Sequence, residues 1–567
     1  MTPEELRDAW SARWDEALAA WGRLVRLSPP RWCMTEEEEK REGLAESFAQ
    51  IRHADHAVIL SARQLHALGL APFALPIMAH EVGHHVYCPG DLADAGRVLA
   101  RVRRGLPGRE DDAPMVSNLY EDALINDRLH RSAGVDMVSV WRALRGDGAS
   151  TRLWALYTTI YEHLWELPAG ELSGVNVDAR TDSDARLGAR LVRVYAKSWV
   201  RGGGRFAALV LPYLEAKGGF EDLLSVMDAT RNRGAGIPDG LVEIEDDEDD
   251  VRHPAFDPDL SGMGETRGGL DERSPLQRHR DLGEYGELLR SLGVRASIEA
   301  VANRYYRERA VPHLVRYPTR RSRRGTDPLP EGLETWDPGS PLESIDWIET
   351  VTRSPVVVPG VTTLQRVHGQ SPGTDAGRQP VDLYVGIDCS GSMPAPRHVT
   401  SYPALAGTIV SLSALRAGAR VKVVLSGEPN GKTLSTPGFV RDESTILDTL
   451  TSYLGTGTGF GVHRLAETFG ERKRLLRPVH VLLLSDTDLF YLLDHVENGQ
   501  AGWDVARRSL ERAGGGGTVV LNTLPMPTHP PVLRLQADGW RVHFVPSWEA
   551  LVDFARDFSR RTYEEQG

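Results

Sequence analysis

Cysteine is scarce in this sequence, with only Cys33, Cys88 and Cys389 in a chain of 567 residues. Three cysteines in a protein of this length do not make a disulfide framework. Basic charge is also in deficit, because the formal net charge is -13. Proteins that bind nucleic acid or anionic membranes generally need a basic face. We therefore expect partners that are neither nucleic acid nor membrane.

Long apolar runs are missing as well. No uninterrupted stretch approaches the roughly 18–20 residues that a membrane-spanning helix needs, and the N-terminal stretch is charged, unlike a secretory signal. The sequence also has no P-loop, the glycine-rich phosphate-binding motif of many ATPases. We therefore expect that any ATP hydrolysis linked to this protein is carried out by a different subunit. These absences predict a cytoplasmic protein.

The distribution of residue types predicts several parts. Apolar residues make up 41% and charged residues 26% of the chain, which is ordinary for a globular protein. Helical spacing of apolar residues dominates the first half, and short apolar runs alternate with helical patterns in the last two hundred residues. We predict a mainly α domain (1–236), an acidic flexible linker (237–284), a connecting segment that packs on the C-terminal domain (285–365) and a doubly wound α/β domain (366–567).

The predicted linker contains the acidic run 243–250 and few apolar residues. Such a segment cannot bury enough apolar surface to offset the entropy lost on ordering, so we expect it to be flexible. A basic run, residues 320–324, is expected either to be solvated or to pair with the acidic linker.

The N-terminal domain contains a candidate zinc site. His80 and His84 are four residues apart, and side chains at this spacing share one face of an α-helix, so both imidazoles can reach one ion. Glu81 lies beside them, where its carboxylate can take a proton from a water that zinc activates. His85 is expected to pack or hydrogen-bond rather than to coordinate, and Cys88 to be a buried small residue.

A catalytic zinc site needs a third protein ligand and an open position for water. Acidic candidates lie in residues 118–127, on a second predicted helix. The arrangement resembles the gluzincin metallopeptidases of the zincin group, in which a glutamate from a following helix completes the site. This resemblance implies Glu121 as the third ligand, with Asp122 as the alternative. Asp127 or Asn126 is expected to orient a ligand imidazole by a hydrogen bond.

The same resemblance implies a zinc metallopeptidase whose preceding strand, residues 57–61, pairs with an extended peptide substrate. Glu81 would act as the general base and then pass the proton to the leaving amine. A group that stabilises the oxyanion is also needed. Three residues are candidates, and the sequence does not choose among them: Tyr120, Arg128 and His130.

A second candidate site follows the apolar run 381–387. Asp388, Ser390 and Ser392 stand at alternate positions, and Gly391 permits a tight turn. The pattern resembles the von Willebrand factor A domain, whose metal-ion-dependent adhesion site (MIDAS) has an aspartate and two serines at this spacing. Cys389 between these residues is interpreted as incidental.

The MIDAS of that family has two further positions, a threonine in a glycine-rich loop and an aspartate after a later strand. The resemblance implies Thr458, with Thr456 as the alternative, and Asp486. Oxygen ligands without nitrogen or thiolate favour a hard cation such as Mg²⁺. Because the protein supplies too few charges to close the coordination shell, we expect a carboxylate from a partner, and therefore docking rather than catalysis.

The segment 336–347 resembles the one that precedes such domains in bacterial proteins partnered with MoxR-type AAA+ ATPases. The arginine that this family has before Ile-Asp-Trp is missing here. We therefore predict a zinc-dependent peptidase coupled to a Mg²⁺-dependent docking domain, working with an AAA+ ATPase on protein or peptide substrates. The alternatives are a non-catalytic adaptor of such an ATPase complex with a structural zinc site, and a protein that inserts a metal or cofactor into a client enzyme.

Overall fold

A computed structural model describes most of the chain, namely residues 2–44, 47–144, 151–214, 236–261, 279–321, 326–338, 340–372, 378–428, 431–470 and 475–564. The protein is mixed α/β and divides into two compact units. Unit 1 comprises residues 1–309 and 394–400, and unit 2 comprises residues 310–393 and 401–567. The predicted connecting segment, 285–365, is therefore shared between the units. Among the described residues, no helix has both the length and the apolar character to cross a bilayer.

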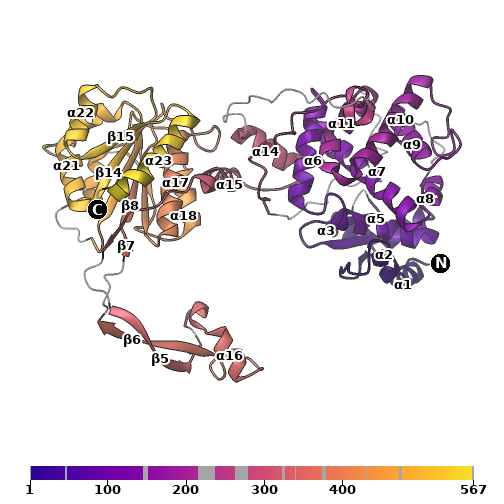
Figure 1. Cartoon of the computed structure of the whole chain (residues 1–567), viewed down its shortest axis with the longest axis horizontal. Helices are drawn as coiled ribbons and strands as arrows, with labels where there is room; N and C mark the ends of the chain where they lie inside the picture. Colours follow the sequence, from indigo (N-terminus) through magenta and orange to yellow (C-terminus); the bar gives the residue numbers. More distant parts are fainter. Residues whose placement is uncertain are drawn as a thin grey trace. The chain divides into compact units, whose positions relative to one another are not determined.

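Unit 1 is built around one central helix, α7 (Ala113–Ala133). Every residue of α7 from 116 to 127 is buried, which is typical of a helix enclosed on all sides rather than of an amphipathic surface helix. Figure 1 shows α7 among the helices that pack on it. These helices are α5 (Ala74–Val86), α6 (Leu92–Gly105), α8 (Met137–Leu144), α9 (Arg152–Leu164), α10 (Ala179–Val194) and α11 (Trp199–Val210).

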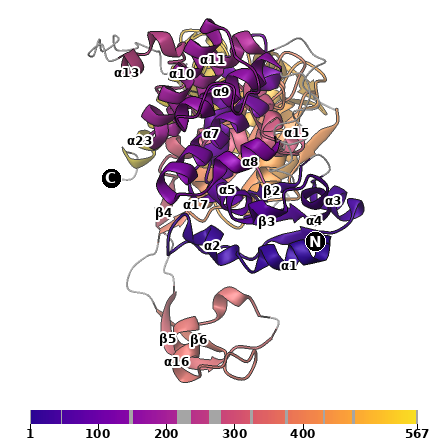
Figure 2. The ribbon, with the colours of Figure 1, turned by 90° about the vertical axis from the view of Figure 1, so that its right-hand side faces the viewer.

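A small sheet accompanies the helices of unit 1. Its strands are β1 (Arg31–Cys33), β2 (Ala49–Arg52) and β3 (Ala57–Ser61), in the order β1-β3-β2. The predicted strand 57–61 is confirmed as β3. Its expected role as the strand that pairs with substrate is wrong, because β1 pairs with one edge of β3 and β2 with the other. Among the described strands β2 pairs only with β3, and Figure 2 shows β2 and β3 next to α5, against which β2 packs.

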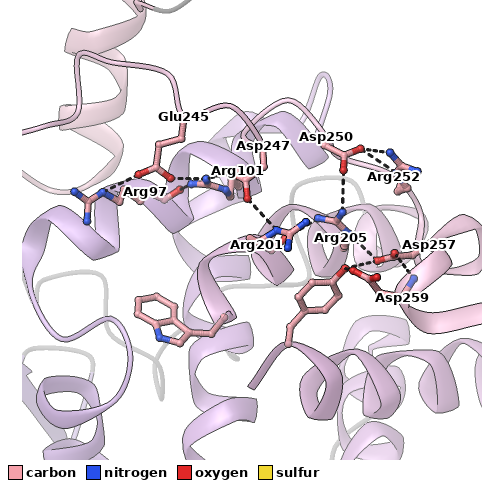
Figure 3. A network of polar contacts seen from close by, with 12 residues as sticks. Arg97, Arg101, Arg201, Arg205, Glu245, Asp247, Asp250, Arg252, Asp257 and Asp259 are labelled. Carbon is pink, nitrogen blue, oxygen red and sulfur yellow. Dashed lines mark hydrogen bonds and ion pairs between the residues drawn. The ribbon is translucent and has the colours of Figure 1, made fainter. Parts of the chain in front are cut away.

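The described part of the predicted linker does not behave as a free linker. Residues 236–261 follow the surface of unit 1 and are held there by arginines of α6 and α11 (Figure 3). Arg101, which is 2% exposed, contacts both Glu245 and Asp247. Arg205 lies 3.1 Å from Asp250 and 2.7 Å from Asp257. The acidic residues are ordered because these buried guanidinium groups need carboxylate partners.

In the described part of the chain, the acidic segment pairs with arginines of unit 1. They come from α6, α11 and Arg280, whose guanidinium contacts Glu248. Of the basic run, only residues 320 and 321 lie within the described part of the chain, in β4 (Thr319–Arg321). The expected pairing of the rest of the basic run, residues 322–324, with the linker lies outside the described residues.

Unit 2 contains a six-stranded sheet in the order β10-β9-β8-β11-β14-β15. All neighbours run parallel except β10 (Thr433–Ser435), which is antiparallel at one edge. The short apolar runs that alternate with helical patterns in the sequence form the five parallel strands: β8 (Asp382–Asp388), β9 (Val421–Ser426), β11 (Val479–Ser485), β14 (Gly514–Leu521) and β15 (Trp540–Phe544).

Helices cover both faces of this sheet. One group contains α17 (Tyr402–Arg416), α18 (Glu443–Leu450) and α23 (Trp548–Glu564), and the other contains α19 (Leu465–Phe469), α20 (Leu489–Asp494) and α21 (Gly502–Ala513). The chain leaves β8 towards β9 on one side and later enters β11 on the other, so the direction of winding reverses at β8. The carboxyl end of β8 is therefore the topological switch point, where open α/β sheets bind their ligands.

A hairpin precedes the sheet of unit 2. Its strands β5 (Thr326–Thr335) and β6 (Leu364–Pro372) pair in antiparallel fashion and carry the short helix α16 (Trp347–Arg353), as Figure 1 shows. The backbone N–H of Leu364 donates to the hydroxyl of Thr350, which anchors α16 on β6.

Candidate metal centres

Helix α5 presents His80 and His84 on one face, as their spacing predicts. Gly83 lies between them and permits a close approach to α7. A Cβ atom at this position would come within 2.6 Å of the Trp21 ring and 2.7 Å of Ile125 Cγ2. The Trp21 indole N–H also donates to the Ala79 carbonyl at 2.7 Å. This packing brings the histidine face of α5 against the side chains of α7.

Three donor atoms converge where the two helices meet. Nε2 of His80 and Nε2 of His84 are 3.2 Å apart, and Oδ1 of Asp122 lies 3.4 Å from the first and 3.2 Å from the second. Ligands held at about 2.0–2.1 Å from one tetrahedral zinc ion lie roughly 3.4 Å from each other. The three donors therefore have the spacing of ligands to a single ion, and they form a group that could hold a metal.

The acidic member of this group is Asp122, the alternative, and not Glu121, the first choice. Oε1 of Glu121 instead lies 3.0 Å from the Ser117 hydroxyl, which donates to it. The two residues are adjacent on α7, so their side chains leave the helix about 100° apart. Burial alone would raise the pKa of Asp122, but the neighbouring imidazoles of His80 and His84 outweigh burial and hold this pKa well below its usual range.

Asn126, and not Asp127, contacts a ligand imidazole. Oδ1 of Asn126 lies 2.7 Å from Nδ1 of His80. Asp127 pairs with Arg131 on the next turn of the same helix, at 3.3 Å. Sequence reasoning offered both residues, and it missed Tyr161, whose hydroxyl accepts a hydrogen bond from the Asn126 amide at 2.8 Å.

The two ligand histidines differ in exposure. The side chain of His84 is fully buried, whereas that of His80 is 16% exposed. Within the described residues, the group contains three protein donors and no fourth His, Cys, Asp or Glu. Structural zinc sites have four protein ligands, whereas catalytic sites have three and an open position. Glu81, on the same helix, is 4% exposed.

The three candidates for the oxyanion have other partners. The Tyr120 hydroxyl donates to the Trp199 carbonyl at 2.8 Å, and burial raises its pKa well above its usual value. The guanidinium of Arg128 lies over the rings of Trp21 and Tyr87. The third candidate, His130, packs against the ring of Trp165. None of these contacts assigns an oxyanion role.

His85 packs as expected, with its ring centroid 4.2 Å from that of His56. Cys88 and Cys389 are both buried. Burial raises the pKa of the Cys389 thiol to about 12.

The second candidate site lies at the carboxyl ends of β8 and β11, at the switch point. Ser392 donates to Oδ2 of Asp486 at 2.6 Å, and the hydroxyls of Ser390 and Ser392 are 3.0 Å apart. The backbone N–H of Ser390 donates to Oδ1 of Asp388 at 2.8 Å. Four of the five predicted MIDAS residues are thus linked by one set of hydrogen bonds.

Asp388 is buried beside a second carboxylate. Burial raises its pKa, hydrogen bonds from Ser485 and Ser390 oppose this, and the charge of Asp486 raises it further. In the described part of the chain, no lysine or arginine pairs with either aspartate. This excess of negative charge and the set of oxygen donors fit a hard cation. Ser485, which donates to Oδ2 of Asp388 at 2.6 Å, was missed, although it directly precedes Asp486.

Thr458 lies in the glycine-rich loop next to this site. The loop is attached by the N–H of Gly455, which donates to the Cys389 carbonyl at 2.9 Å. Gly455 and Gly457 both have positive φ, a conformation that favours glycine. The side chains of Thr458 and of the alternative, Thr456, are exposed, and among the described residues neither is hydrogen-bonded to the other four.

Comparison with known proteins adds no identification. No protein-family model, curated protein or solved structure matches the chain. The inference of function therefore depends on the geometry of the two candidate sites.

Proposed function

We propose that this protein is a zinc-dependent peptidase joined to a Mg²⁺-dependent docking domain of the von Willebrand factor A type. The observation that carries the peptidase proposal is the convergence of His80, His84 and Asp122 at separations of 3.2–3.4 Å. Their number, three, supports a catalytic rather than a structural site. With an aspartate as the third ligand, the site departs from the gluzincin pattern while keeping the zincin helix.

When bound, a zinc ion would polarise the scissile carbonyl and acidify a water molecule. The protein's own residues have separate tasks. His80, His84 and Asp122 would hold the ion, and Asn126 fixes the orientation of the His80 ring. Glu81 would take up a proton during attack and return it to the leaving amine.

The docking proposal is supported by the arrangement at the end of β8. Four residues would hold Mg²⁺, namely Asp388, Ser390, Ser392 and Asp486. The exposed Thr458 would join them if its loop closed. When bound, the ion would offer an open position to a carboxylate of a partner protein. The proposed partner is an AAA+ ATPase of the MoxR type, which would deliver protein substrates to unit 1.

A Glu81→Gln variant tests the peptidase proposal. We expect one zinc per chain by elemental analysis in both proteins, and a loss of peptide hydrolysis of at least about 100-fold in the variant, because general-base catalysis contributes roughly 10²–10⁴-fold. Zinc-loaded wild-type protein that hydrolyses no peptide from a diverse library would contradict the proposal and favour the adaptor.

A further inference from the structure

Helix α16 exposes an apolar face. Trp347, Ile348 and Val351 are 51%, 74% and 52% exposed, whereas the polar Thr350 is the residue of α16 that is buried, against β6. This order is inverted with respect to an ordinary surface helix, which buries its apolar residues and exposes its polar ones.

The loop after α16 continues this apolar surface. Val356, Val357, Val358 and Val361 are each at least 40% exposed. We call these four valines and the three apolar residues of α16 the apolar patch. Exposed apolar residues normally occur singly, and a contiguous cluster indicates an interaction site.

The loop holds its valines in place by its own hydrogen bonds. The Thr362 hydroxyl donates to the Val356 carbonyl at 2.8 Å and accepts from the Val358 N–H at 2.7 Å. The Ser354 hydroxyl also donates to the Val356 carbonyl. A loop whose backbone is fixed in this way loses less conformational entropy on binding.

The sequence of this loop favours a contact between a fixed number of chains over the edge-to-edge addition of strands from one chain to the next. Pro355 and Pro359 bracket the three consecutive valines, and prolines at these positions block addition of a further strand. Residues 354–363 contain no charged side chain. Charged residues are depleted at the core of protein interfaces, and two copies of an uncharged surface can meet without bringing like charges together.

The size of the apolar patch matches one side of a standard protein interface. A fully exposed aliphatic side chain has an accessible area of roughly 60–120 Å², and a tryptophan has more. The seven side chains of the patch are 40–74% exposed and therefore present on the order of 400 Å² of apolar surface. A standard interface buries about 800 Å² per partner, of which somewhat more than half is apolar. We propose that the apolar patch is a homodimer interface, occupied by the same patch of a second copy around a two-fold axis.

Sedimentation equilibrium of the full chain tests this proposal. We expect a mass that rises with concentration to that of two chains of 62.5 kDa each. Ile348→Glu and Val357→Glu place a charge in the centre of the patch and should each raise the dissociation constant at least about 30-fold. The matched control is Leu476→Glu, a residue of unit 2 that is 82% exposed outside the patch, which should leave the constant unchanged.

A thiol-labelling experiment gives an independent readout. The three native cysteines are buried, so an Ile348→Cys variant adds an accessible thiol. Its rate of maleimide labelling should fall as protein concentration rises. A mass of one chain at all concentrations, a dimer that both glutamate variants leave intact, or a labelling rate independent of concentration would overturn the proposal.

Discussion

Oδ1 of Asn126 accepts a hydrogen bond from Nδ1 of His80 at 2.7 Å. The direction follows from the neighbouring hydrogen bonds. The Tyr157 hydroxyl donates to the Leu119 carbonyl, so the Tyr161 hydroxyl, 2.9 Å away, donates to Tyr157 and accepts from the Asn126 amide nitrogen. The amide oxygen therefore faces His80 and the imidazole carries its proton on Nδ1. Nε2 is left with a lone pair that points towards His84 and Asp122, as metal binding requires.

The first prediction concerns this contact. An Asn126→Leu variant should bind zinc about 10–100-fold more weakly, because partners of ligand imidazoles usually contribute that much to metal affinity. Competition with a chromophoric chelator measures the change. The matched control is Asp127→Asn, which alters the neighbouring residue that pairs with Arg131 and should retain wild-type affinity. The opposite ranking would show that Asp127 orients the imidazole.

The second prediction separates the two acidic residues of α7. Asp122→Asn should purify with much less than one zinc per chain, because it removes a charged donor from a three-ligand site. Glu121→Gln should keep the metal, since the Ser117 hydroxyl can donate to an amide oxygen as well. Elemental analysis of both proteins decides the matter, and zinc lost from Glu121→Gln alone would restore the gluzincin assignment.

The third prediction concerns Mg²⁺. Saturating Mg²⁺ should raise the melting temperature of the wild-type protein, because a ligand at 100 times its dissociation constant stabilises the folded state by about 2.7 kcal/mol. Asp388→Asn should abolish this increase, whereas Asp504→Asn, an exposed aspartate of α21, should preserve it. Thermal scans with Mg²⁺ and with EDTA supply the measurement. An equal increase in Asp388→Asn would exclude Mg²⁺ binding at the end of β8.

The fourth prediction concerns pH. Burial lowers the pKa of His480 in β11 to about 4, so this histidine is neutral in the folded protein. The unfolded chain has a histidine pKa of about 6.5 and binds a proton earlier as pH falls. Stability should therefore decrease between about pH 6.5 and 4, by up to about 3 kcal/mol from this residue. Urea unfolding at several pH values tests this, and His480→Gln should flatten the slope in that window; a slope unchanged by the substitution would contradict it.

The fifth prediction concerns the acidic segment. Arg205→Met leaves Asp257, which is 1% exposed, without its guanidinium partner, and a broken buried pair costs about 3–5 kcal/mol. Arg252→Met removes an exposed partner of Asp250 and should cost less than about 1 kcal/mol. Urea midpoints of the two variants provide the comparison. Equal, small effects would mean that the acidic segment is not held by Arg205.

The sequence determined the features that depend on local spacing. The helix that carries His80 and His84 follows from the four-residue repeat, and the strands of unit 2 follow from short apolar runs that alternate with helical patterns. The serines and aspartates at the end of β8 could be found for the same reason, since a strand and the turn after it are contiguous in the chain.

Tertiary structure alone decided which side chains meet. Helix α7 is buried along residues 116–127, so its sequence has no apolar stripe to indicate which face contacts α5, and the packing places Asp122 at the site in place of Glu121, the first choice. The central position of β3 depends on pairing with β1, which is distant in the sequence. The acidic segment is ordered because buried arginines from α6 and α11 require charge partners, and composition alone does not reveal such a requirement.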